Sequence, residues 1–379
     1  MRPPAAPRSA FPRPVLAQRT GLAALALAAL ALGTALAQDP VGEDEYYIRT
    51  IAKIGDTRLP SARSRAMGSA WAALSNDGAS VQENPAAVGA MDGRGFEGML
   101  GFNQVDNGDD RKSETLYRVG GALSVAGASG ASQTVGMAFS RRSQDEAYTT
   151  GGLEQNAFTV AYGSSCGPDL LWGLALSGYN GEHSYHWTTD DRDRTAWSGG
   201  ELAAGVLYRM GDDFTLGATG GYGGGSARSH RADSAGLRTH QSGTLNRYFL
   251  RGGLAWQLAP ATLLAGDLGW SQNRMRFKAR SGLDARDTSV SEWDLGLGIE
   301  HALLPERLVA RAGAGYHYTS YSPGGAAAGQ RAPYGMNTHC LSFTAGLGAR
   351  LGPAMDLGYT LDLRTNGDVG NYLSAQIGF

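Results

Sequence analysis

The run GSSCG at residues 163–167 has the G-x-S-x-G spacing of a serine nucleophile held on a sharp strand-to-helix turn. A helix must follow the serine in that arrangement, but Pro168 and Asp169 come next and a strand pattern begins directly after them. The glycine-rich run at residues 217–225 likewise lacks the strand and helix that flank a nucleotide-binding loop. The sequence therefore predicts no catalytic residue and a protein that is not an enzyme.

Several short stretches carry side chains of the types that bind metal ions. Histidines and a carboxylate occur together in EHSYHW, and carboxylates cluster in TTDDRDR and DNGDD. All three stretches read as external loops, where solvated charge is the commoner role of such residues. We therefore predict no metal site and no cofactor. The residues considered are Glu182, His183, His186, Asp190, Asp191, Asp193 and the range 106–110.

From Gly95 to the C-terminus, apolar and polar residues alternate with the period of two that indicates β-strands. In the stretch Ser291–His301, Trp293, Leu295 and Leu297 share one face, and the opposite face is charged or glycine. We count about 14 such segments of about 9–14 residues each, which is longer than the strands of most globular sheets and suited to crossing a bilayer at a tilt. Short turns alternate with longer polar stretches, as in outer-membrane barrels.

These features predict an all-β fold, a transmembrane antiparallel β-barrel of about 14 strands over residues 95–379. Closure satisfies every backbone hydrogen-bonding group inside lipid. A soluble sandwich has the same alternation, but strand length, the turn pattern and the closing strand NYLSAQIGF favour the barrel. Cys166 would then lie in a periplasmic turn and Cys340 near the outer rim, about 25 Å apart. Because that separation is beyond disulfide reach, we predict two free thiols.

The polar faces of these strands would line the lumen, and their ionisable side chains would contact a plug or a ligand. Ion pairs that hold a plug are the favoured role, and direct ligand contact is the alternative. An acidic ligand would use the arginines, because a guanidinium pairs with a carboxylate in a bidentate manner. The residues are Arg118, Arg251, Glu292, Asp294, Glu300, Arg311, His317, Arg350, Asp356, Asp362 and Arg364.

Residues 1–37 have the features of a secretory signal peptide. Four arginines precede the apolar run Gly21–Ala37, which ends in the small-x-small sequence Ala35-Leu36-Ala37. We predict cleavage after Ala37 and localisation in a bacterial outer membrane, with an uncleaved anchor as the alternative. Without the four arginines the chain has 29 basic and 35 acidic residues, a charge near −6, so nucleic-acid binding is not expected.

Residues 38–94 lack the strand alternation and form a separate segment ahead of the barrel, for which the resemblance described below implies the role of a hatch, or plug. Ser61 is a candidate N-cap for a helix within residues 59–77, where small and apolar residues recur at helical spacing. Asn84 can cap a second helical turn, because Pro85 suits the first helical position, at which its missing N–H costs nothing.

The stretch RAMGSAWAALSNDGASVQENPAAVGAM at residues 65–91 resembles the N-terminal signature of the FadL-type long-chain fatty acid transporters and their relatives. That signature has an acidic-small turn followed by Asn-Pro-Ala. In that family the segment is a hatch inside a 14-stranded barrel. The same stretch is also similar to barrel proteins that act as shuttles in type IX secretion. The resemblance implies hatch or gating roles for Asp77, Gly78, Asn84, Pro85 and Ala86.

By this resemblance the chain is expected to be an outer-membrane channel or transporter for hydrophobic, fatty-acid-like small molecules, gated by its hatch. The alternative is a shuttle or binding barrel for secreted protein partners without solute transport. The polar loops depart from the greasy external lip of the fatty-acid branch, which leaves the ligand open. Expected partners are outer-membrane lipid and lipopolysaccharide, the barrel assembly machinery, a hydrophobic ligand and, in the alternative, a secreted protein cargo.

Overall fold

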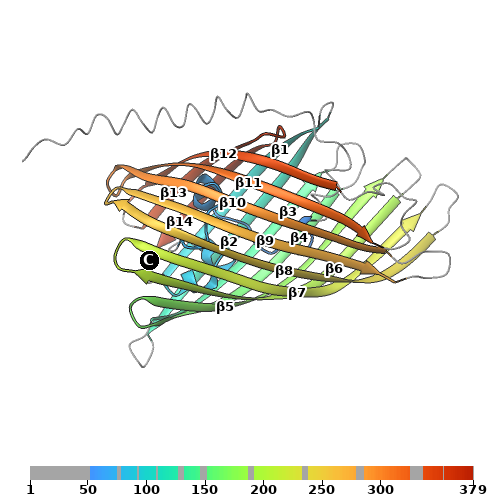
Figure 1. The fold of residues 1–379 in the computed structure, drawn as a ribbon, viewed down its shortest axis with the longest axis horizontal. Coiled ribbons are helices and arrows are strands. Elements are labelled where there is room, and N and C mark those ends of the chain that lie inside the picture. The colour runs from blue at the N-terminus through green and yellow to red at the C-terminus, as the bar shows by residue number, and fades with distance from the viewer. Residues whose placement is uncertain are drawn as a thin grey trace, which may run out of the picture.

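The computed structural model describes residues 52–74, 78–91, 94–107, 110–126, 132–145, 152–186, 192–232, 238–278, 286–324, 336–352 and 354–378 of the 379-residue chain. They form a closed antiparallel barrel of fourteen strands, in which each strand pairs with its neighbours in sequence and the first pairs with the last (Figure 1). The predicted all-β barrel and its strand number are confirmed. The strands are β1 (Arg94–Asn107), β2 (Asp110–Ala126), β3 (Ser132–Asp145), β4 (Gly152–Cys166), β5 (Leu170–His186), β6 (Arg192–Met210), β7 (Phe214–Ala232), β8 (Arg238–Ala259), β9 (Thr262–Phe277), β10 (Arg286–Leu304), β11 (Leu308–Gly324), β12 (Met336–Arg350), β13 (Met355–Arg364) and β14 (Val369–Gly378).

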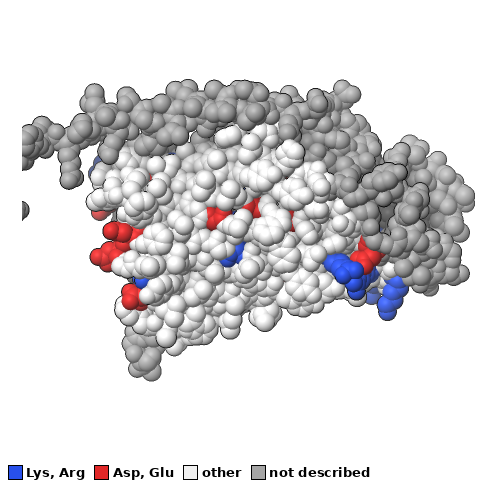
Figure 2. Space-filling model, in the orientation of Figure 1, with Lys and Arg blue, Asp and Glu red and all other residues white. Residues whose placement is uncertain are grey.

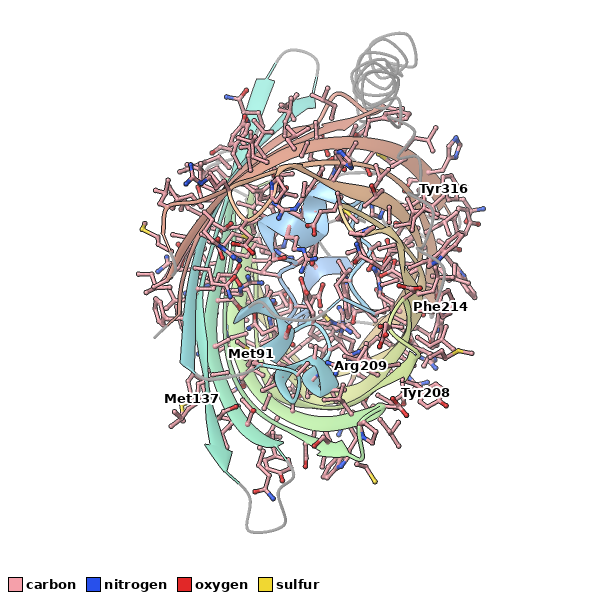
Figure 3. The ribbon with its side chains drawn as sticks, turned by 90° about the vertical axis from the view of Figure 1, so that its left-hand side faces the viewer. Met91, Met137, Tyr208, Arg209, Phe214 and Tyr316 are labelled. Carbon is pink, nitrogen blue, oxygen red and sulfur yellow. The ribbon has the colours of Figure 1, made fainter. Side chains whose placement is uncertain are left out.

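The outer surface of the barrel is apolar over its middle. On β5, for example, Trp172, Leu174 and Leu176 are exposed on the outside, whereas the alternate residues face the lumen and most are buried. On the face seen in Figure 2, charged side chains gather mainly at the two ends of the barrel, with a small group between them. Viewed from one end, Met137 and Tyr208 stand outside the ring of strands (Figure 3). This arrangement suits a barrel whose outer face contacts lipid.

Strands β5 to β8 are longer than the sequence predicted. The stretches 180–199 and 223–243, expected as long loops, are largely continuations of these strands. Most side chains there are polar or small on both faces, with exceptions such as Trp197, so the alternation that marks a strand is weak although backbone pairing continues. Cross-strand contacts such as the ion pair of Arg194 with Glu182 support the extension. Glu182 and its neighbour His183 point to opposite faces of β5, so they do not form a common metal site.

Pairing along the wall is continuous through most of its length. The register shifts among the described strands lie at Gln257/Ala259 and at Ala302/Leu304, close to the short turns that join β8 to β9 and β10 to β11. The ladders of β3 with β2 and with β4 run without a shift.

The N-terminal residues 52–74 and 78–91, hereafter the luminal segment, lie inside the barrel (Figure 3). The segment contains helix α3 (Ala62–Ala66), the 3₁₀ turn η1 (Gly78–Val81) and helix α4 (Pro85–Val88). Helix α3 contacts β11 to β14, η1 contacts β1 to β4, and α4 contacts β3 to β6, so the segment touches opposite sides of the ring. None of the described helices is long and apolar enough to cross a membrane.

Two predictions for the luminal segment have different outcomes. Ser61 caps α3 by accepting a hydrogen bond from the backbone N–H of Ser64, as expected. The helix predicted within residues 59–77 is wrong in its length, because the chain turns at Gly68 and Ser69, which have φ angles of 69° and 66°. The carbonyl oxygens of β10 and β11 approach Gly68 so closely that a side chain would not fit there.

Both cysteines are free thiols, as predicted. Cys166 is exposed at the end of β4, beside the short turn to β5, and Cys340 is buried on β12.

Candidate functional site in the barrel lumen

The lumen near the end with the longer loops contains an apolar cluster. Inward-facing side chains of β4 to β11 meet Ala52 and Ile54 of the luminal segment there. The interior of an outer-membrane barrel is usually polar, so apolar residues at inward positions are unusual. The cluster is therefore a place where an apolar group could be held inside the barrel. Its largest members are Leu153, Tyr179, Trp197, Leu245, Met275, Val290 and Tyr321.

Two cavities adjoin helix α3. The first, here called the outer cavity, has a volume of about 190 Å³ and is lined by Arg65 of α3 together with Arg247, Arg251 and Glu292 of the wall, among others. The second, the inner cavity, has a volume of about 290 Å³ and lies at the end with the short turns, where Arg63 of α3 is part of its lining. Residues two apart on a helix point to nearly opposite sides, so α3 separates the two cavities.

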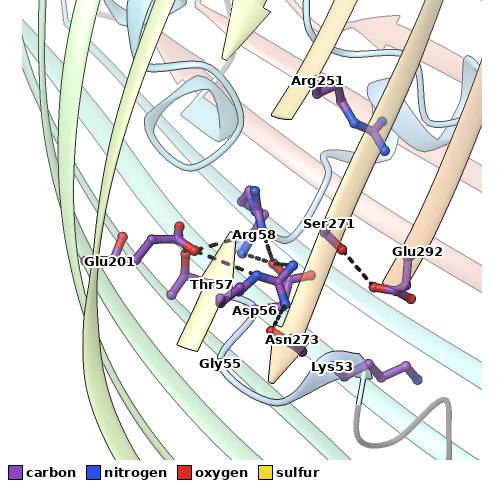
Figure 4. Close-up of polar contacts among 12 residues, drawn as sticks. Lys53, Gly55, Asp56, Thr57, Arg58, Glu201, Arg251, Ser271, Asn273 and Glu292 are labelled. Carbon is purple, nitrogen blue, oxygen red and sulfur yellow. Dashed lines mark hydrogen bonds and ion pairs between the residues drawn. The ribbon is translucent and has the colours of Figure 1, made fainter. Parts of the chain in front are cut away.

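An ion-pair network below the apolar cluster ties the luminal segment to β6 and β8 (Figure 4). The carboxylate of Asp56 lies 3.0 Å from the guanidinium of Arg58 and 3.0 Å from that of Arg247. Glu201 lies 3.9 Å and 3.8 Å from the same two arginines and accepts a hydrogen bond of 3.0 Å from the hydroxyl of Thr57. We call Asp56, Arg58, Glu201 and Arg247 the latch.

The charged neighbours of Asp56 within the latch decide whether its carboxyl group is ionised. Burial by itself raises the pKa of Asp56, but the guanidiniums of Arg247 and Arg58 outweigh burial and hold the pKa well below its usual range. Burial lowers the pKa of Arg58, an effect that Glu201 and Asp56 oppose. Asp56 is therefore ionised at neutral pH.

A second set of contacts fixes the backbone after α3. Asp267 of β9 accepts hydrogen bonds from the backbone N–H groups of Trp71, at 2.8 Å, and Ala72, at 3.3 Å. Arg251 of β8 pairs with Asp267 at 3.2 Å and with Asp294 at 2.8 Å, and donates to the carbonyl oxygen of Ser69. Asp294 also contacts the imidazole of His317, a residue of β11, at 2.5 Å.

A third set holds the segment to β1 and β2. Glu97 pairs with Arg118 at 2.8 Å and accepts a hydrogen bond of 3.1 Å from the backbone N–H of Ala79. Arg118, which is fully buried, also donates to the carbonyl oxygen of Leu59. Gly78 packs directly against the Glu97 side chain.

The remaining predicted lumen residues fall into pairs. Glu300 bridges Arg63 of α3, at 2.9 Å, and Arg311 of β11, at 2.7 Å, and so closes one side of the inner cavity. Two further pairs are Arg350 with Asp356 and Arg364 with Asp362, each at 3.0 Å. The Arg350–Asp356 pair is half-exposed at the rim with the short turns. Glu292 forms no such pair among the described residues and accepts a hydrogen bond from the hydroxyl of Ser271.

Three of the predicted hatch residues, Asn84, Pro85 and Ala86, lie together at the start of α4, whereas Gly78 begins the η1 turn. Asn84, which is fully buried, accepts from the backbone N–H of Ala86 and donates to the carbonyl oxygen of Ala72 at 2.7 Å. Pro85 occupies the first helical turn, as expected. Asp77 lies outside the described residues.

Glycines of the wall let the luminal segment approach closely. A Cβ atom at Gly173 of β5 would lie 2.2 Å from the carbonyl oxygen of Pro85, and one at Gly217 of β7 would lie 2.0 Å from that of Ala72. Any larger residue at these positions would push the segment away from the wall. Part of the high glycine content of this chain, 56 of 379 residues, therefore serves the contact between segment and wall.

Sequence reasoning missed several residues that make these contacts. Asp56 and Arg58 lie in a stretch without strand alternation, so no pattern marked them. Glu97, Glu201 and Asp267 stand at inward positions of their strands, and the alternation that identified the other lumen charges would have found them as well.

Solved structures with the same fold include toluene transporters and a FadL homologue. The toluene transporter TbuX of Ralstonia pickettii has a TM-score of 0.60 and 12% identity over 86% of this chain and 100% of that one. A FadL homologue of Pseudomonas aeruginosa has a TM-score of 0.61 and 13% identity over 85% and 99%. The toluene transporter TodX of P. putida has a TM-score of 0.57 and 13% identity over 86% and 99%. The expected resemblance to FadL-type barrels is thus confirmed for the fold. No family model matches the chain, and no curated protein matches it in sequence.

Proposed function

We propose that this protein is an outer-membrane channel that admits small hydrophobic molecules and that its N-terminal region, residues 38–94, is the gate. The observation that carries the proposal is a closed barrel with an apolar outside whose lumen is filled by a segment fastened through ion pairs. Solved barrels of the same fold are named toluene transporters, which supports a small hydrophobic ligand. The barrel would be exported by the leader, recognised by the assembly machinery and surrounded by lipid and lipopolysaccharide.

Capture would occur at the apolar cluster. A ligand that replaces Ile54 there would bury its own apolar surface against Trp197 and Leu245. Removing Ile54 would at the same time pull on the latch, because Asp56 follows it by two residues. Ligand binding and release of the gate would therefore be coupled through a few residues of extended chain.

Passage would follow the barrel axis. Because the described wall is continuously hydrogen-bonded at β2, β3 and β4, a ligand would have to pass helix α3 between the outer and inner cavities. Displacement of α3 would break the hydrogen bonds that its carbonyls at Ala62 and Ala66 accept from Thr360 and Thr344. It would also break the ion pair of Arg63 with Glu300, but none of these contacts belongs to the pairing between wall strands, so α3 can move without unfolding of the barrel.

A reversible disulfide between α3 and the barrel wall tests whether movement of α3 opens the channel. A Cβ atom at Gly358 of β13 would lie 4.0 Å from the Cβ of Ala62, which is within the range of a disulfide, and 2.6 Å from the hydroxyl oxygen of Ser374, so the Ser374 side chain must turn away to admit a cysteine. In a chain carrying Cys166→Ser, the pair Ala62→Cys and Gly358→Cys should close under oxidation and fasten α3 to the wall. We expect oxidised protein in proteoliposomes to lose saturable toluene uptake and reduced protein to regain it.

The matched control is Ala62→Cys alone, in the same Cys166→Ser background, which cannot form the cross-link. Equal uptake by the oxidised and reduced double variant would contradict gating by α3. Uptake by wild-type proteoliposomes no faster than by empty vesicles would contradict the channel function itself.

A further inference from the structure

The outer cavity is lined mainly by charged side chains, and nearly all of its cations have a carboxylate partner. Among its basic residues, six form an ion pair within 4.0 Å with a carboxylate of the wall or of the luminal segment. Those carboxylates are fixed from behind by further hydrogen bonds, as Asp267 is by Trp71. The six are Lys53, Arg58, Arg142, Arg247, Arg251 and Arg364.

Arg65 differs from these six. Its side chain lines the outer cavity and only 8% of the residue is exposed, yet no described carboxylate lies within ion-pair distance of it. Its guanidinium lies over the ring of Tyr372, 4.2 Å from the ring centre, and its Nε has no hydrogen-bond acceptor among the described residues. A buried charge without a counter-ion is costly, and a stacked guanidinium keeps its hydrogen-bonding edge available.

The carboxyl groups that line the outer cavity are engaged by other residues. Glu114, Asp56 and Asp294 form ion pairs with Lys53, Arg247 and Arg251, and Glu292 accepts a hydrogen bond from Ser271. None of these described contacts involves Arg65, so an anion that enters the cavity would find at α3 a guanidinium without a described carboxylate partner.

We propose that the outer cavity is a binding site for a compact organic anion, a small molecule with one carboxylate and a short apolar body, and that Arg65 binds the carboxylate. This deepens the proposed function and rests on it for the route by which the anion arrives. The body would lie against apolar side chains that line the cavity, such as Trp71 and Phe249, and the carboxylate would form the bidentate pair that Arg65 lacks among the described residues. A long acyl chain fits the cavity poorly, because it would press apolar surface against hydrated charges.

Benzoate and toluene form a matched pair of probes, since they differ by a carboxylate in place of a methyl group. In titration calorimetry of the purified full-length barrel in detergent, we expect saturable benzoate binding that is at least tenfold tighter than toluene binding. Arg65→Gln should weaken benzoate binding about tenfold or more, the effect of losing one charge-assisted contact, and leave toluene binding unchanged. Arg65→Lys should recover only part of the affinity, because lysine lacks the planar fork.

Two controls separate local charge from general damage. Arg141→Gln removes an exposed arginine that pairs with Glu154 outside the lumen, and it should leave benzoate binding unchanged. Glu292→Gln changes another polar group of the same cavity, one that contacts Ser271, and it should not weaken benzoate binding. Folding of each variant is checked by circular dichroism and by its thermal transition.

Benzoate binding that is no tighter than toluene binding, or that survives Arg65→Gln in a folded barrel, would overturn the anion site. Weakening by Glu292→Gln equal to that by Arg65→Gln would overturn it as well. These results would leave toluene uptake untouched. Conversely, Arg65-dependent benzoate binding by a barrel that transports nothing would support the site and reject the channel.

Discussion

Asp56→Asn should loosen the gate without harming the barrel. The substitution removes the charge that pairs with Arg58 and Arg247, each at 3.0 Å. Removal of one partner from a fully buried ion pair costs about 3–5 kcal/mol of stability, because the other charge stays buried without a partner. Here the Asp56 side chain is 23% exposed and Glu201 stays near both arginines, so we expect a smaller loss of about 2 kcal/mol. The barrel wall makes no use of Asp56 in its own strand pairing.

A loss of about 2 kcal/mol from the closed state corresponds to an increase of about 30-fold in the ratio of open to closed channels. Single-channel recording in planar bilayers measures that ratio directly as open probability. Asp287→Asn is the matched control, because Asp287 also pairs with two arginines, Arg274 and Arg276, but on the outside of the barrel. We expect no change in its open probability.

The dependence of open probability on pH follows from the protonation of Asp56. Because the pKa of Asp56 is lowered in the folded state, its contribution to closure is complete above its ordinary value of 3.8 and is lost only as the pH falls below that value toward the folded pKa. The latch should thus hold wild-type open probability constant from about pH 7 to about pH 4. An unchanged open probability in Asp56→Asn, or an equal rise in Asp287→Asn, would refute the assignment of the latch.

Three other perturbations test the luminal segment and the topology. Asn84→Ala combined with Pro85→Ala removes a helix cap and a buried hydrogen bond worth about 1 kcal/mol each, and should raise ion leakage in planar bilayers. Gly173→Ala places a methyl group against the carbonyl of Pro85 and should likewise raise leakage, and it should lower the thermal midpoint. Cys166, exposed beside a short turn, should react with a membrane-impermeant maleimide only after the outer membrane of intact cells is opened, because that turn is expected to face the periplasm.

Each of these tests has its own contradicting result. Wild-type conductance in the double variant would show that the cap does not hold the segment in place. Gly178→Ala adds a methyl group on the outer face of the same strand, where nothing lies within 4 Å, so equal leakage from it would argue against close packing at Gly173. Labelling of Cys166 in unbroken cells would reverse the orientation, whereas buried Cys340 should stay unlabelled in the folded protein.

Local features of the fold could be predicted from the sequence because they depend on neighbouring residues. Alternation marked the strands and their inward faces, and the structure places Arg118, Arg251 and Glu300 at inward positions, where they contact the luminal segment. Ser61 and Asn84 were identified as caps because a cap needs only a side-chain oxygen and the next few N–H groups. The extension of β5 to β8 was missed because both faces of those strands are polar there.

Only the tertiary structure decided which charged side chains pair with one another. The sequence by itself predicted the approximate number of strands, the inward and outward faces of the alternating segments and the free state of both thiols. It could not pair Asp56 with Arg247, 191 positions apart, or leave Arg65 without a carboxylate, because those outcomes depend on where a short segment comes to rest inside a closed ring. It likewise could not set the end of α3, where close contact of Gly68 with the wall, together with the reversed backbone at Gly68 and Ser69, prevails over local helical preference.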